Sequence, residues 1–235
     1  MPHERGGSNS EPQEKRAVGL AFATGLAALA GWVDAVAYVH LNGLYVSYMS
    51  GNSTALGVSL FGKTQVSAMA FGAVVFGFVA GVFGGELIVH FGGRRGQVFL
   101  FLAEAALLLA GAGIIALDSR SWLAAIPLTV ALGMQNGTIY LIGGASMATT
   151  YVTGTLVHAA RGFAHAWLRL ESWRAPLPYV ALWCGLVCGA AGGAIIARHS
   201  PAAALVVAAI AALCFASRIG FIDRASRDFT NEGPP

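Results

Sequence analysis

The stretch Tyr45–Thr54, YVSYMSGNST, decides how the whole chain is interpreted, because a related stretch, Thr149–Thr155 (TTYVTGT), occurs in the second half. Each stretch is polar, centred on a glycine, and preceded by a hydrophobic segment. The two hydrophobic segments end in similar motifs, Gly31–Tyr38 (GWVDAVAY) and Gly133–Tyr140 (GMQNGTIY). At an offset of 102, Gly31, Asp34 and Tyr38 match Gly133, Asn136 and Tyr140.

A third pair of motifs follows in the same order. Gly77–Gly85, GFVAGVFGG, matches Gly185–Gly193, GLVCGAAGG. Three matched pairs in one order indicate an internal duplication, with a first repeat over residues 17–117 and a second over residues 122–219.

The composition is that of an integral membrane protein. The 235 residues are 56% hydrophobic and 11% charged, with a mean hydropathy of +0.67. A soluble domain carries about 25% charged residues. The net charge of +3 comes from basic residues placed between hydrophobic segments, so it indicates the lipid bilayer as a partner and no nucleic acid.

We therefore predict an all-α membrane protein with a single membrane domain over residues 17–219. A disordered cytoplasmic tail precedes it at 1–16, and a second cytoplasmic tail follows at 220–235. Six segments have close to the roughly 20 apolar residues that a spanning helix needs. They are 17–40, 66–91, 97–117, 122–145, 177–197 and 201–219.

Two weaker segments, 44–62 and 146–163, contain the duplicated polar stretches. Short segments broken by glycine at corresponding positions of two halves indicate the binding site of a transporter. If both re-enter the membrane, six helices span it and the repeats are inverted; if both span it, the repeats are parallel. We expect re-entry. Both arrangements place 11 of the 14 arginine and lysine residues inside, so both predict cytoplasmic termini.

Three acidic residues lie within hydrophobic segments, where an ionisable group usually faces a cavity or a partner. Asp34 belongs to the duplicated motif. It is either a proton or cation site, or a carboxylate near the helix end that is solvated or caps the next turn. Glu86 and His90 share a helix face, and with Glu104 they are candidates for a proton relay. An interfacial salt-bridge cluster with Arg94 and Arg95 is the alternative for Glu86 and His90.

The candidate substrate or ion path consists of the polar and glycine residues of the duplicated motifs. Helices that begin at such glycines would direct free amides toward an anion or a carbonyl group; alternatively, the hydroxyl residues cap and join helices. The path residues are Asp34, Tyr38, Ser50, Gly51, Asn52, Thr54, Gln135, Asn136, Tyr140, Thr153, Gly154 and Thr155.

The third motif pair predicts helix packing. Glycine recurs every four residues at Gly77, Gly81 and Gly85 and again at Gly185, Gly189 and Gly193. This spacing lets helix backbones approach closely. No catalytic motif or spaced metal ligands appear, so we expect no enzyme activity, no metal and no cofactor.

The motif pairs GWVDAVAY with YMSGNSTALG and GMQNGTIY with TTYVTGTL resemble the YoaK family of bacterial membrane proteins, domain of unknown function 1275. The resemblance covers about residues 17–219. In the usual family pattern Met-Thr-Gly-Asn, Ser50 replaces the threonine and keeps the hydroxyl group. The resemblance implies a bacterial inner-membrane protein of about six helices and supplies no substrate.

From these observations we expect a small secondary transporter or channel for an unidentified small molecule or ion. The alternative is a non-transporting scaffold or accessory subunit whose glycine faces bind partner helices. A homo-oligomer is compatible with either.

Overall fold

A computed structural model describes residues 13–62, 64–118, 121–137 and 152–231, and every regular element among them is a helix. The α-helices are α1 (Gln13–His40), α2 (Met49–Phe61), α3 (Ala68–Gly92), α4 (Gly96–Leu117), α5 (Ala125–Gly137), α6 (Val152–Trp167), α7 (Leu177–Ala197) and α8 (Pro201–Asn231). Two short 3-10 turns, η1 (Gly93–Arg95) and η2 (Trp122–Ala124), precede α4 and α5. The predicted all-α class is confirmed.

Four stretches of the described chain are long and apolar enough to cross a membrane. They are Ala17–His40, Ala68–Leu117, Leu177–Ala197 and Pro201–Gly220. The second contains both α3 and α4, which have 25 and 22 residues and are separated by η1. The molecule is thus a helical membrane protein.

Several boundaries differ from the predicted ones. Helix α1 begins at Gln13, within the predicted tail, and α8 continues to Asn231, past the predicted boundary at 219. Of the predicted segment 122–145, the structure describes η2 and the 13-residue α5; residues 138–145 lie outside the described part. The weak segment 44–62 contains the 13-residue helix α2, whereas the 16-residue helix α6 begins within the segment 146–163 and continues past it to Trp167.

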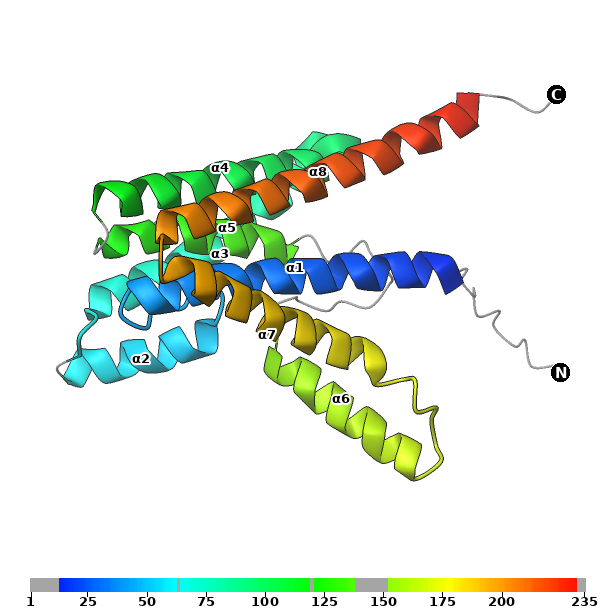
Figure 1. Cartoon of the computed structure of the whole chain (residues 1–235), viewed down its shortest axis with the longest axis horizontal. Coiled ribbons are helices and arrows are strands. Elements are labelled where there is room, and N and C mark those ends of the chain that lie inside the picture. Colours follow the sequence, from blue (N-terminus) through cyan, green and yellow to red (C-terminus); the bar gives the residue numbers. More distant parts are fainter. Residues whose placement is uncertain (1–12, 63, 119–120, 138–151, 232–235) are drawn as a thin grey trace, which may run out of the picture.

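The direction of the helices follows from Figure 1. Helix α1 starts and α8 finishes at the same end of the molecule, on the right of the view. The chain turns back after α1, and α2 then runs in the same direction as α1 toward the left-hand end. Helix α6 starts near the middle and runs to the right-hand end, so the two short helices point in opposite directions.

Helices α1 and α7 form the most extensive contact, and glycines make it possible. A Cβ atom added at Gly189 would overlap the backbone carbonyl of Ala28, and one added at Gly193 would lie 2.9 Å from the Cα of Trp32. In the other direction, a Cβ at Gly31 would overlap the carbonyl oxygen of Leu186. The two backbones therefore touch without side chains between them.

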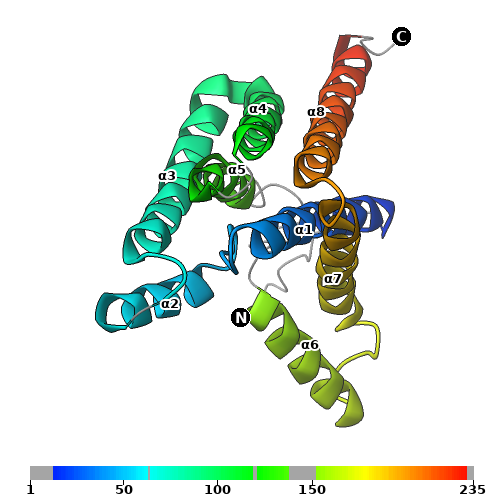
Figure 2. The same ribbon diagram turned by 60° about the vertical axis from the view of Figure 1, so that its left-hand side comes forward.

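Helices α3 and α5 repeat this arrangement. A Cβ atom at Gly81 would overlap the carbonyl oxygen of Val130, and one at Gly85 would lie 2.9 Å from the Cα of Met134. A Cβ at Gly133 would in turn overlap the carbonyl oxygen of Phe78. Each half of the chain thus packs a glycine-rich helix against a helix of the other half, as Figure 2 also shows from a second side.

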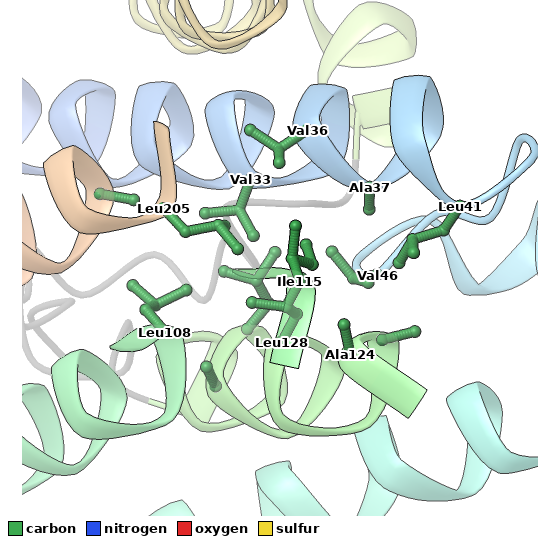
Figure 3. Packing of buried hydrophobic residues seen from close by; sticks show 14 of the residues in the cluster. Val33, Val36, Ala37, Leu41, Val46, Leu108, Ile115, Ala124, Leu128 and Leu205 are labelled. Atoms are coloured by element: carbon green, nitrogen blue, oxygen red, sulfur yellow. The ribbon is translucent and has the colours of Figure 1, made fainter. Parts of the chain in front are cut away.

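The apolar core lies where α1, α4, α5 and α8 meet. Figure 3 shows Val33 and Val36 of α1 above Leu108 of α4 and Leu128 of α5, with Leu205 of α8 beside them. These five side chains are all fully buried. The core therefore joins both halves of the chain.

Leucine at Gly81 or Gly189 should destabilise the protein strongly, because its side chain would have to separate two backbones in contact. Overpacking of a core typically costs about 1–3 kcal/mol, and we expect each variant to reach at least the upper part of that range. Thermal unfolding in detergent measures the effect. Gly84→Leu is the matched control on α3, since nothing lies within 4 Å of an added Cβ there; a Gly81→Leu variant that melts like Gly84→Leu would contradict the packing argument.

Candidate functional site

The chain reverses direction directly after α1. Asn42 and Gly43 both have positive φ angles, 55° and 84°, and the amide of Gly43 donates to the carbonyl oxygen of Tyr38 at 3.1 Å. This is the 6→1 hydrogen bond of a Schellman-type helix end, in which Asn42 takes the left-handed position that glycine and, less often, asparagine adopt. The turn sends residues 44–48, here called the returning segment, back along α1 before α2 begins.

Asp34 fastens the returning segment to α1. One of its carboxylate oxygens accepts hydrogen bonds from the amides of Val46, at 2.7 Å, and Ser47, at 2.9 Å. The other accepts a hydrogen bond from the Ser47 hydroxyl. One carboxylate thus satisfies three donors of the returning segment.

Two further helices hold the same segment. The side-chain amide of Asn52, on the first turn of α2, donates to the carbonyl oxygen of Tyr45 at 2.7 Å. The hydroxyl of Thr129 on α5 lies 3.0 Å from the carbonyl oxygen of Val46 and 3.1 Å from that of Val74 on α3, so it can donate to either. Val46 is therefore held through both its N–H and its C=O group, as buried non-helical backbone requires.

The first turn of α2 follows without a side-chain cap. Gly51 is packed against the ring of Tyr48, where a Cβ would overlap the ring. Ser50 and Thr54 are exposed, and the Thr54 hydroxyl donates to the carbonyl oxygen of Ser50 at 3.1 Å. Only Asn52 of the predicted path residues on this helix is buried.

The rings of three tyrosines gather beside this turn. The ring centroid of Tyr45 lies 5.1 Å from that of Tyr38 and 5.4 Å from that of Tyr48. Tyr38 and Tyr48 are both exposed. The predicted path residue Tyr38 thus belongs to an aromatic cluster at the surface of the segment.

The second half places its motif residues on α5 and α6. Gln135 is fully buried, and its side-chain amide donates to the carbonyl oxygen of Leu26 on α1 at 2.9 Å. The Asn136 amide donates to Leu132 within its own helix at 2.8 Å. On the first turn of α6, Gly154 and Thr155 are buried and Thr153 is exposed. Tyr140 lies outside the described residues.

The matched motif residues Asp34 and Asn136 lie at different heights along α1. Gln135 contacts α1 at Leu26, eight residues before Asp34, which is about 12 Å along a helix. Asp34 instead lies beside the returning segment, near Thr129. Asp34 and Asn136 therefore belong to different ends of the α1–α5 crossing.

The candidates for a proton relay are dispersed as well. Glu86 and His90 are exposed on α3, and no ion pair joins them. Glu104 is fully buried on α4. Among the described residues, no group of three His, Cys, Asp or Glu side chains is placed to hold a metal ion.

Sequence reasoning missed several polar contacts that hold this region. They involve Thr129, Ser47 and two α1 side chains: the Trp32 indole donates to the carbonyl oxygen of Ala204 at 2.8 Å, and His40 Nε2 lies 2.7 Å from the carbonyl oxygen of Ala197. The signal available for Thr129 was a hydroxyl group in the middle of a strongly apolar predicted span.

The fold and the site define an α-helical membrane protein in which polar side chains hold a non-helical segment. We call the hydrogen bonds that Asp34, Asn52 and Thr129 form with the returning segment the polar bracket. The model of the family "Protein of unknown function (DUF1275)" matches residues 22–217, and the chain belongs to this family. The chain is 32% identical over 205 residues to the UPF0700 transmembrane protein RA0705 of Rhizobium meliloti (strain 1021), covering 86% of each protein. No solved structure matches the chain. The family resemblance found in the motifs is confirmed.

We predict that Thr129→Val loosens the returning segment, because valine keeps the shape of threonine and removes the donor to Val46 and Val74. A lost buried hydrogen bond should lower stability by about 1 kcal/mol. Amide hydrogen exchange of a peptide covering residues 41–52 measures the loosening. Thr54→Val is the control, since its hydroxyl is exposed and bonds only within α2; equal exchange in both variants would contradict the bracket.

Proposed function

We propose that this protein is a small secondary transporter or channel whose polar path runs between the first turns of α2 and α6. The observation that carries the proposal is that two short helices begin between the two ends of the molecule and point in opposite directions (Figure 1). In both views the starts of α2 and α6 face the same central region beside α1 (Figures 1 and 2). Discontinuous helices of this kind form the binding sites of many transporters.

We further propose that the two short helices re-enter the membrane and that six helices span it, in two inverted repeats. The opposite directions of α1 and α5, and of α3 and α7, support inversion. The contacts support duplication: Gly81 meets Val130 as Gly189 meets Ala28, and Gly133 meets Phe78 as Gly31 meets Leu186. These partners match at the sequence offsets of 102 and 108 found for the motifs.

The proposed orientation places both termini in the cytoplasm of a bacterial cell, in its inner membrane. Arg94 and Arg95 join α3 to α4, and Arg169 and Arg174 lie between α6 and α7, all at the end where α1 starts and α8 finishes (Figure 1). Arg198, between α7 and α8, lies at the other end. This distribution supports the orientation through the positive-inside rule.

The chemistry of the path favours a solute with an anionic group or a carbonyl oxygen. The first turn of α2 has no side-chain cap, and the free amides at the start of a helix attract negative charge. Asn52 and Thr155 are the buried polar side chains on the first turns of α2 and α6.

We expect cysteines at Ser50 and Thr153 to react with a membrane-impermeant thiol reagent, because both positions border the proposed aqueous path. The experiment uses reconstituted protein in which Cys184, Cys188 and Cys214 are replaced by alanine, since all three are exposed. Phe76→Cys is the control: Phe76 is 75% exposed on the apolar outer face of α3 and should meet lipid. If neither Ser50→Cys nor Thr153→Cys reacts faster than Phe76→Cys, the scaffold function replaces the transporter.

Intact bacterial cells that express the protein allow a direct test of orientation. A reporter fused after Pro235 should be cytoplasmic, and a cysteine at the exposed Asp118, between α4 and α5, should be labelled from outside the cell. A C-terminal reporter on the outside, or labelling of Asp118→Cys only after the cells are opened, would contradict the proposed orientation.

A further inference from the structure

Glu104 is the one fully buried carboxyl group in the described part of the chain whose oxygens have no hydrogen-bond partner. Its side chain has 0% exposure, and neither carboxyl oxygen meets a donor. Asp34, by contrast, has three donors from the returning segment. The two intramembrane acids therefore differ in kind: one is built into a hydrogen-bonded bracket, and the other is isolated.

The surroundings of Glu104 are apolar. One helical turn before and after it, Leu100, Phe101 and Leu108 of α4 are fully buried. Residues three or four apart share a helix face, so Glu104 lies on the face that packs into the core. There Phe101 contacts Phe22 of α1 and Phe215 of α8, with ring centroids 6.2 Å and 5.9 Å apart.

Charged groups near enough to compensate the carboxylate are missing among the described side chains. Helix α4 packs against α3, α5, α8 and the two 3-10 turns, and its Phe101 also contacts α1. On α3, η1 and α8 the titratable groups whose surroundings are described are all exposed: Glu86, His90, Arg94, Arg95, Cys214 and Arg218. On α1, Asp34 is bound by the returning segment and His40 lies beside the carbonyl oxygen of Ala197. Helix α5 and η2 carry no titratable residue.

These conditions favour the neutral acid. An unpaired carboxylate removed from water costs several kcal/mol even after relaxation of its surroundings, whereas a protonated carboxyl group loses only its hydrogen bonds to water. The packed arrangement therefore holds a proton on Glu104. If the helices around Glu104 separate and admit water, the carboxylate can be hydrated and the proton can leave.

We propose that Glu104 is the proton-binding group that couples proton movement to opening of the helices around α4. This inference rests on the proposed transport function and names its coupling ion. The packed state binds the proton more tightly than a hydrated state, so protonation must in turn favour the packed state by the same free energy. The step is a simple exchange: a proton from water binds the carboxylate and returns to water on the other side.

Infrared spectroscopy of the reconstituted protein at pH 7 tests this without any transported solute. Wild type should show the C=O band of a protonated carboxylic acid, Glu104→Gln should lose it, and Glu86→Gln, altered at an exposed site, should keep it. Replacing water by D2O should shift the wild-type band as the helices open. A spectrum without the band, or a band that never shifts in D2O, would overturn the inference.

Two further measurements keep the test decisive. If Glu104→Gln fails to fold, Glu104→Asp retains the acid and should move the band instead of removing it; an unmoved band would assign it to another residue and refute the proposal. The transport function itself is judged by the separate thiol reactions at Ser50 and Thr153. Unreactive cysteines together with an exchanging Glu104 band would refute transport alone, while reactive cysteines without the band would refute only the role of Glu104.

Discussion

Direct contact between helix backbones is the constraint on which the rest of this protein depends. At Gly81, Gly133, Gly31 and Gly189 no side chain separates the helices, and an added Cβ would overlap a carbonyl of the facing helix. In a membrane such contacts are the main source of helix association, because lipid is as apolar as the side chains it would replace. The pairs α1–α7 and α3–α5 therefore fix where the remaining helices can pack.

These two pairs also position the non-helical backbone. Because α5 lies against α3, the Thr129 hydroxyl reaches both Val74 on α3 and Val46 in the returning segment. Asp34 of α1 holds the same residue from the other side. The returning segment that precedes α2 is thus supported by helices from both halves, and these contacts fix where α2 begins.

The sequence was informative about helices and much less about the roles of polar residues. Runs of apolar residues located α3, α4, α7 and α8 within a few residues at their starts, because length and hydropathy are local properties. The four-residue glycine spacing predicted close packing but could not name the partner helix. Asp34 and Glu104 looked alike in sequence, since both are single acids in apolar segments; only the surrounding helices distinguish a carboxylate with three donors from one with none.

The pairing of α1 with α7 has a consequence for biosynthesis. Helix α1 is made first, but Leu186 of α7, which contacts Gly31 of α1, is more than 150 residues farther along the chain. Helix α5, the partner of α3, is synthesised much sooner after α3 than α7 is after α1. The growing chain must therefore hold α1 in the bilayer with one face uncovered while α3, α4 and α5 already assemble. Any interruption of synthesis before α7 leaves this face of α1 without its partner, and incompletely packed apolar surface of this kind is prone to misassembly.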